Sequence, residues 1–158
     1  MNSHRLQSPA MAVPLTCTTI GAYTLRTPSA WGIELLPTAP PYHALHLRPS
    51  DQVAFDFAVL GGLGSREIAQ QFLTMYREEA LGGSTRTVTL DLPSGTCDGL
   101  AFRLPFGETC VHREVYALSH LGNLLGVSLT WEADAQDVGQ LRRHFELVLF
   151  ATLRANLS

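Results

Sequence analysis

Residues 100–131 read LAFRLPFGETCVHREVYALSHLGNLLGVSLTW, and their pattern decides the fold class. Apolar side chains alternate with other side chains in three segments of this stretch, and a period of two indicates strands with one buried face. The first segment ends at residues 107–108 (GE) and the second at residues 121–123 (LGN), which are typical turn sequences. Connections this short join antiparallel neighbours, so we expect a meander of strands here.

The segments on either side of this stretch complete the pattern. Residues 86–92 alternate like a further strand, and residues 53–60 (VAFDFAVL) do so most regularly. Between them, Ser65 is placed to cap a helix that ends at residues 82–83 (GG). A closing helix is expected over residues 136–154, with Arg142 and Arg143 on its solvent face. Further short strands are expected at residues 20–25, 31–36 and 43–47.

This order of elements predicts an α+β sandwich, in which an antiparallel sheet of about six to seven strands is covered by helices. Strands cluster in hairpins, which argues against a doubly wound α/β fold. The 158 residues suit one domain, with residues 1–18 as a flexible N-terminal tail and residues 19–158 as a single α+β domain. The sequence leaves open whether Met1 or Met11 is the first residue.

The composition excludes several classes of protein. Hydrophobic residues make up 46% and charged residues 16%, which is enough apolar material for a core and too little charge for a disordered chain. The net charge is −3 without a basic stripe, so nucleic acid is not an expected partner. The chain contains no lysine, which excludes phosphate-loop and Schiff-base chemistry. No apolar run approaches about 18 residues, so we expect no transmembrane segment and a cytoplasmic location.

The candidates for metal binding and acid/base catalysis are weak. His43 and His46 would point to opposite faces of a strand and could not share a metal ion. His112 and Glu114 share a strand face, which fits an acid/base pair but fits an ordinary sheet face better. Residues 61–65 (GGLGS) are interpreted as a turn into a capped helix in preference to an anion-binding loop. We therefore predict no catalytic residue, no metal site and no cofactor.

The three cysteines are Cys17, Cys97 and Cys110. Cys97 and Cys110 could meet across neighbouring strands, but free thiols in a reducing compartment are the preferred interpretation. A small cysteine-dependent enzyme is kept as an alternative, because Cys110 lies two residues from His112 on the same predicted strand face.

Several short motifs follow one another in a defined order. They are Tyr23-Thr24-Leu25 with Pro28, Trp31 and Ile33; the helix at residues 65–81; residues 98–103 (DGLAFR); and Ser128-Leu129-Thr130 before a helix that contains Phe145. In this order they resemble the PsbP-like superfamily, which includes Ran-binding Mog proteins, DcrB-type proteins, LpqN-type lipoproteins and the Eag chaperones of type VI secretion. The resemblance spans residues 20–153, and the lipoprotein signal of the LpqN-type branch is missing.

The resemblance implies binding more than chemistry, because members of the superfamily mostly act as accessory, assembly or chaperone proteins. Our first hypothesis is a non-catalytic binding or adaptor protein with a protein partner, and a secretion-associated chaperone is its most specific form. The candidate binding surface consists of apolar positions that helices or a partner must cover: Phe106, Tyr116, Leu118 and Leu124. Homodimerisation through a sheet edge is left open.

A small-molecule carrier is the second hypothesis. Its candidate pocket lies between sheet and helix and is lined by Trp31, Phe57, Phe102 and Trp131. A densely packed interior would exclude such a pocket.

Overall fold

The computed structural model of the chain describes residues 14–78, 85–92 and 95–155. The elements in this part are β1 (Leu15–Ile20), β2 (Tyr23–Pro28), β3 (Gly32–Leu36), β4 (Tyr42–Ser50), β5 (Val53–Leu60), α2 (Arg66–Arg77), β6 (Arg86–Leu92), β7 (Gly95–Phe106), β8 (Thr109–His120), β9 (Asn123–Glu132) and α3 (Val138–Ala155). β1 begins at Leu15, so residues 15–18 of the expected tail pair with β2, whereas residues 1–13 lie outside the described part.

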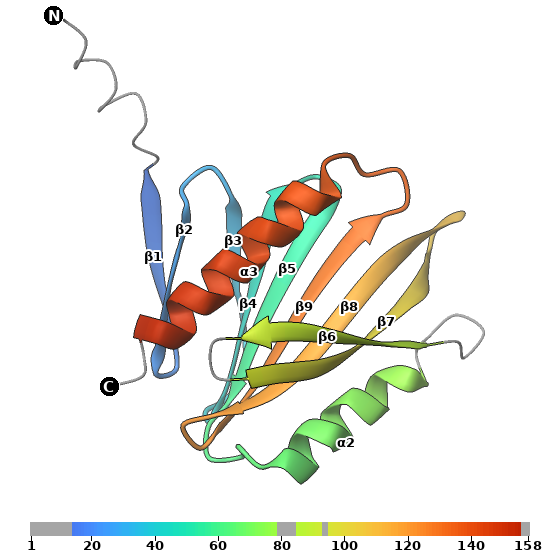
Figure 1. Cartoon of the computed structure of the whole chain (residues 1–158). Coiled ribbons are helices and arrows are strands. Elements are labelled where there is room, and N and C mark those ends of the chain that lie inside the picture. The colour runs from blue at the N-terminus through green and yellow to red at the C-terminus, as the bar shows by residue number, and fades with distance from the viewer. Residues whose placement is uncertain (1–13, 79–84, 93–94, 156–158) are drawn as a thin grey trace, which may run out of the picture.

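Seven strands form one antiparallel sheet in the order β3-β4-β5-β9-β8-β7-β6, and β1 and β2 form a separate hairpin (Figure 1). The predicted α+β class with its antiparallel sheet is therefore confirmed. β9 pairs with β5 along the whole of that strand, from Val53 opposite Trp131 to Leu60 opposite Leu124. This pairing joins the meander to the first half of the chain.

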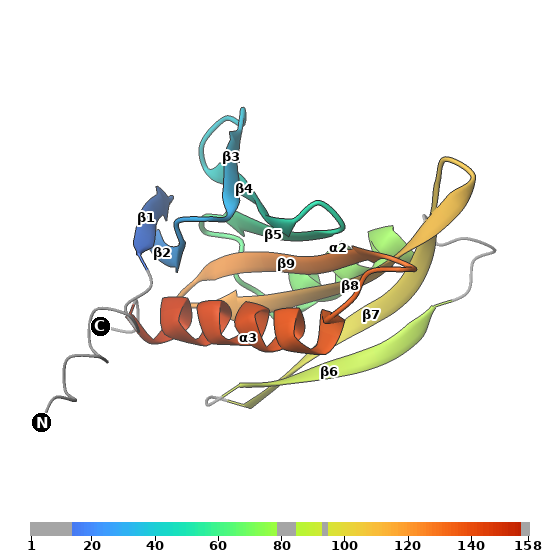
Figure 2. The ribbon, with the colours of Figure 1, turned by 90° about the horizontal axis from the view of Figure 1, so that it is seen from above.

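The two helices cover opposite faces of the sheet (Figures 1 and 2). The alternating apolar residues of β5 are buried on the α3 face, as their period of two predicted. On β8, Tyr116 packs in the core under α3, whereas its neighbour Val115 packs in the core under α2. The described chain therefore has two apolar layers, one on each face of a single sheet.

Local sequence explains how α2 forms and approaches the sheet. Ser65 caps the helix, and its hydroxyl oxygen accepts a hydrogen bond from the backbone N–H of Ile68 at 3.1 Å. The capping agrees with the interpretation of residues 61–65 as a turn into a helix. A methyl group on Gly126 of β9 would lie 2.5 Å from Phe72 Cζ, so only glycine lets α2 pack this closely.

The β1–β2 hairpin is held to the sheet by residues of the opening motif. Tyr23 is 1% exposed, and its hydroxyl lies 2.8 Å from His120 Nδ1. Burial lowers the pKa of His120, which keeps this imidazole neutral near pH 7. Trp31 packs edge-on against Phe55, with ring centroids 5.3 Å apart. These motif residues therefore have a structural role in the described chain.

The four residues of the predicted carrier pocket do not line one pocket between the sheet and a helix, although Phe102 and Trp131 both line a shallow cavity of about 230 Å³. Trp31, Phe57 and Trp131 pack with the core under α3. Phe102 packs in the core under α2, on the other face of the sheet. A gap between the sheet and α3, lined by residues such as Phe57 and Phe145, has a volume of about 10 Å³, which is room for one water molecule.

The positions of the predicted binding surface were expected to be covered by helices or by a partner, and the chain itself covers three of the four, so these three are not open to a partner. Tyr116 and Leu118, at 2% and 9% exposure, belong to the core under α3. Leu124, at 1% exposure, belongs to the core under α2. Phe106 ends β7, and its side chain lies outside the described part of the structure. Neither described helix is long and apolar enough to span a membrane.

Candidate functional site

A buried carboxylate lies on the α3 face of β8. Glu114 is 2% exposed, and its Oε1 accepts a hydrogen bond from the Tyr116 hydroxyl at 2.7 Å. Arg142 of α3 donates from Nη2 to Glu114 Oε2 and forms an ion pair with it. Burial, together with the hydrogen bond to Glu114, raises the pKa of Tyr116, so its hydroxyl remains a donor. A buried charge of this kind is stabilised only while its partners are in place.

A shallow cavity of about 230 Å³ opens beside this network. Five of its lining residues define what we call the arginine groove: Arg86, Ala101, Arg103, His112 and Trp131. Strand pairing builds the groove, because Arg103 lies opposite His112 and His112 lies opposite Trp131 in one row across β7, β8 and β9. Ala101 lies between Arg86 on β6 and Glu114 on β8, and its single methyl group leaves the space that becomes the hollow.

The wall of the groove is formed by stacked rings. His112 stacks on Trp131, with ring centroids 5.4 Å apart and an interplanar angle of 22°. The guanidinium carbon of Arg142 lies 5.9 Å from the centroid of the Trp131 ring, within the range of a cation–π contact. Glu114 therefore orients Arg142, which in turn packs on Trp131.

The groove carries an excess of positive charge. Arg86 and Arg103 are exposed, and neither has an ion-pair partner among the described residues. The charge of Arg142 is offset by Glu114. Two free guanidinium groups thus line a concave surface of a chain whose net charge is −3.

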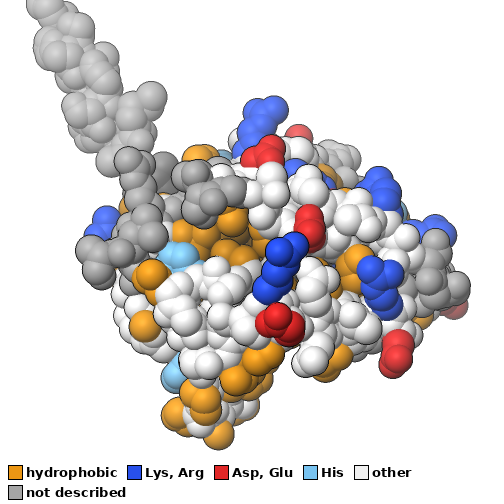
Figure 3. Space-filling model, turned by 60° about the horizontal axis from the view of Figure 1, so that its bottom comes forward, with side chains coloured by type: hydrophobic (Ala, Val, Ile, Leu, Met, Phe, Trp, Pro, Cys, Tyr) orange, Lys and Arg blue, Asp and Glu red, His pale blue; other side chains and the backbone are white. Residues whose placement is uncertain are grey.

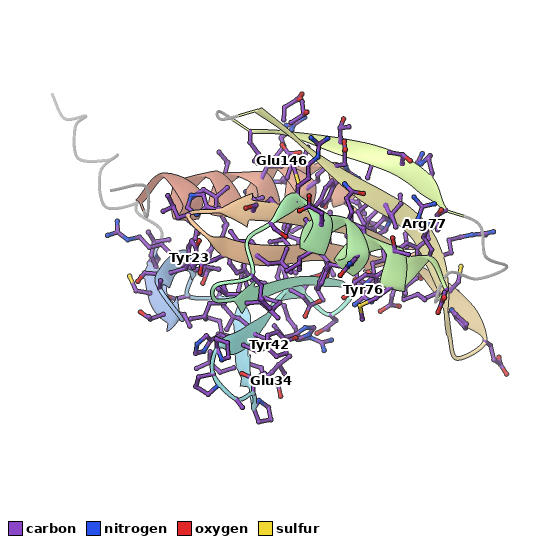
Figure 4. The ribbon with its side chains drawn as sticks, turned by 90° about the horizontal axis from the view of Figure 1, so that it is seen from below. Tyr23, Glu34, Tyr42, Tyr76, Arg77 and Glu146 are labelled. Atoms are coloured by element: carbon purple, nitrogen blue, oxygen red, sulfur yellow. The ribbon has the colours of Figure 1, made fainter. Side chains whose placement is uncertain are left out.

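A second surface lies on the β3–β4 hairpin, which projects from the body of the molecule (Figures 2 and 4). Leu35, Leu36 and Tyr42 are 60%, 39% and 41% exposed, and we call these three residues the hairpin patch. Hydrophobic side chains gather at this projecting end in the space-filling view (Figure 3). β3 is the first strand in the sheet order, so its outer edge has no neighbouring strand within the described sheet.

The two histidines considered for metal binding lie on opposite faces, as expected. His43 pairs with Val59 of the core under α3, whereas His46 lies opposite Asp56 on the other face. The Nδ1 atom of His46 lies 2.6 Å from Asp56 Oδ1. No group of three or more His, Cys, Asp or Glu residues in the described part is arranged to hold a metal ion.

The described structure does not form the acid/base pair considered from the sequence. The two oxygens of Glu114 bind Tyr116 and Arg142, while His112 stacks on Trp131. Arg142 and Arg143 were expected on the solvent face of the closing helix. Arg143 is exposed, whereas Arg142 is only partly so, with a side chain that is 37% exposed and a guanidinium that reaches the buried carboxylate.

All three cysteines are free thiols. Cys97 lies near the start of β7, whereas Cys110 of β8 lies opposite Pro105, near the end of β7. The two thiols are therefore too far apart for a disulfide. Burial raises the pKa of the Cys97 thiol to about 11, and the charge of Asp98 adds to the shift. Cys97 is therefore protonated and unreactive near neutral pH.

The sequence predictions missed the arginines of the groove. The residues that form its floor and outer wall, Arg86, Ala101 and Arg103, were not singled out. Their strands were predicted, and the period of two does place Ala101 and Arg103 on one face of β7. The pattern within one strand does not say which residues of the next strand lie opposite, so it could not place Arg103 beside His112.

No protein-family model matches the sequence, and no curated protein sequence is similar enough to match. Solved structures share the fold over most of the chain. Cyanobacterial PsbP (CyanoP) from Synechocystis sp. PCC 6803 matches with a TM-score of 0.53 and 12% identity over 99% of this chain and 96% of that one. The fold is PsbP-like.

The Saccharomyces cerevisiae Ran-binding protein Mog1p matches with a TM-score of 0.52 and 11% identity over 92% of this chain and 95% of that one. A protein from Bacteroides thetaiotaomicron VPI-5482 matches with a TM-score of 0.53 and 12% identity over 82% of this chain. The match covers only 43% of that protein, so this chain spans less than half of its length. At these identities the likeness concerns the PsbP-like fold alone.

Proposed function

We propose that the protein is a non-catalytic adaptor that binds a partner protein through the hairpin patch. The observation that carries this proposal is the exposure of Leu35, Leu36 and Tyr42 together on a projecting hairpin. Leu36 and Tyr42 share one face of the hairpin, and Leu35 lies on the other. Apolar side chains exposed singly are ordinary, but several of them grouped at one projecting edge are typical of a protein–protein interface. The patch is in addition continuous with a free strand edge.

The free edge suggests how a partner docks. The outer backbone N–H and C=O groups of β3 can pair with an extended segment of the partner, which adds a strand to the sheet. Successive side chains of β3 point to opposite faces, so Leu35 and Leu36 would contact the added segment from both sides of the sheet. Main-chain pairing would supply affinity, and the leucines would supply selectivity.

The shared fold also supports an adaptor. Mog1p, which shares the fold, is described as a Ran-binding protein, so the PsbP-like scaffold can serve a protein partner. A chaperone that shields an apolar segment of a secreted partner is the most specific form of the proposal. The free thiols fit a reducing compartment, and we place the adaptor in the cytoplasm as part of the same proposal.

The test compares Leu35→Asp with a matched control. Leu147 on α3 is 62% exposed, close to the 60% of Leu35, but it lies away from the hairpin. Tagged wild-type protein, Leu35→Asp and Leu147→Asp are used to recover partners from the native lysate, and each partner is quantified by mass spectrometry. We expect Leu35→Asp to lower recovery of the specific partner about ten-fold, because a charge replaces an apolar contact at the centre of the interface.

The control separates docking from general effects of a surface charge. Leu147→Asp should recover the partner as well as the wild-type protein does. Equal recovery by wild-type protein and Leu35→Asp would overturn the proposal, as would an equal loss in both variants. Recovery of the protein itself from the membrane or secreted fraction only would contradict the cytoplasmic location.

A further inference from the structure

We propose that the arginine groove binds an acidic peptide segment, in which two carboxylate side chains stand two residues apart in an extended chain. This site lies on the α3 face of β6, β7, β8 and β9, apart from the hairpin patch at the β3 edge. This proposal is independent of the function proposed above. It concerns a second contact, between the groove and an acidic peptide.

The charges of the groove define the ligand. Arg86 and Arg103 present guanidinium groups without an ion-pair partner in the described chain, and like charges at neighbouring sheet positions repel each other. Glu114 is the acidic residue beside them, and Arg142 and Tyr116 occupy its two oxygens. A bound carboxylate would relieve the repulsion and accept charge-assisted hydrogen bonds from the guanidinium groups.

The shape of the groove selects part of a larger molecule. Its volume of about 230 Å³ is below the roughly 300 Å³ at which pockets begin to enclose a free small molecule. The hollow over Ala101 is also open to solvent, so it suits one or two side chains of a docked segment. Its wall is preorganised by the contacts among His112, Trp131 and Arg142, which lowers the cost of ordering the site on binding.

The strand register defines the spacing of the carboxylates. Arg86 lies opposite Ala101, and Arg103 follows Ala101 by two residues, so the arginines are diagonal neighbours about 7–8 Å apart at their backbone positions. Side chains on one face of an extended peptide repeat every two residues, a distance of about 7 Å. A peptide with glutamate at both of two such positions therefore matches the two arginines.

The experiment measures binding of a labelled peptide to the full chain. The probe is fluorescein-labelled Ser-Gly-Glu-Ser-Glu-Gly-Ser, followed by fluorescence anisotropy at low ionic strength. The matched probe carries glutamine at both glutamate positions. We expect Arg86→Ala and Arg103→Ala each to raise the Kd about five- to ten-fold, because each removes one charge-assisted contact.

Two variants make the measurement specific. Arg77→Ala removes the same charge from the exposed end of α2, on the other face of the sheet (Figure 4), and should leave the Kd unchanged. Ala101→Leu fills the hollow without changing the charge and should raise the Kd. The hairpin variant Leu35→Asp should bind the peptide normally, so failure of the groove and failure of the hairpin patch are distinguishable.

Several outcomes would overturn the proposal. One is equal binding of the glutamate and glutamine peptides, and another is equal weakening of binding by Arg77→Ala and Arg103→Ala. A third is displacement of the probe by inorganic phosphate at the concentration at which the unlabelled glutamate peptide displaces it, because this would indicate a site for small anions only.

A second measurement follows binding to the wild-type protein and needs no variant of the groove. The chain has two tryptophans, and their indole N–H signals in NMR spectra can be assigned with Trp31→Phe. Saturating glutamate peptide should shift the Trp131 signal, because Trp131 lines the groove, and should leave Trp31 in place. The absence of a Trp131 shift in the wild-type protein would overturn the proposal even if Ala101→Leu is unstable.

Discussion

The hairpin patch and the arginine groove are built on different parts of the same sheet. The hairpin patch lies at an edge, is apolar and is exposed around its leucines. The groove is concave, carries free positive charge and rests on a carboxylate that is 2% exposed. A change in the patch should therefore affect partner binding alone, whereas a change beneath the groove should affect binding and stability together.

The largest expected effect tests the support of the groove. Arg142→Met should lower the free energy of unfolding by about 3 kcal/mol, because it leaves the Glu114 carboxylate buried without its cation. The same variant should weaken binding of the glutamate peptide, since Arg142 also packs on Trp131. Urea denaturation and peptide anisotropy provide the two measurements.

Arg143→Met is the matched control for this comparison. Arg143 is the next residue of α3 and is exposed, so its loss should change stability by less than about 0.5 kcal/mol. If the two variants are equally stable, the buried ion pair does not support the groove in the way described.

An intermediate effect is expected at Gly99 of β7. A methyl group added there would lie 2.4 Å from Tyr116 Cδ1 and 2.6 Å from the backbone oxygen of Val115. Gly99→Ala should therefore lower stability by about 1–3 kcal/mol, because it displaces the ring that binds Glu114. Gly139→Ala on α3 is the control, since nothing lies within 4 Å of the added methyl group and alanine favours the helix. A thermal unfolding midpoint for Gly99→Ala at or above that of the wild-type protein would contradict the packing described for Tyr116.

The smallest effect is expected on the stability of the hairpin variants. Leu35→Asp should cost less than about 1 kcal/mol, because the side chain is 60% exposed and the loss is limited to the strand preference at an edge. The same urea denaturation series measures it. A loss as large as that of Arg142→Met would mean that the hairpin patch is part of the folded core, and the contrast between the two surfaces would fail.

Much of the fold was predictable because its signals are local. The alternation in residues 53–60 and in the meander identified strands, and Ser65 identified the start of a helix. The predicted binding surface failed for a related reason. Alternation shows that Tyr116, Leu118 and Leu124 belong to covered faces, but it does not distinguish cover by the chain's own helices from cover by a partner.

The pairing of the strands separates the side chains of the candidate pocket between two cores. Phe57, Phe102 and Trp131 each lie on an apolar strand face, and only the register shows that Phe102 is on the other side of the sheet. The ion pair of Arg142 was missed because helical spacing places this residue beside the solvent face, while its partner lies on a strand 28 residues earlier in the chain.

By itself, the sequence determined the α+β class, the order of strands and helices from residue 53 onward, and the absence of lysine chemistry, because periodicity, turns and composition are properties of neighbouring residues. It did not separate β1 from β2, since the strand expected at residues 20–25 spans the turn between them. Only the tertiary structure decided that β9 inserts between β5 and β8, which faces α2 and α3 cover, and that Arg86 and Arg103 share a hollow above Ala101. The pairing of β5 with β9 depends on hydrogen bonds and packing that no local pattern contains. The groove arises from the register of consecutive strands, and the hairpin patch from the place of β3 at the edge of the sheet, and neither is contained in the pattern of one strand.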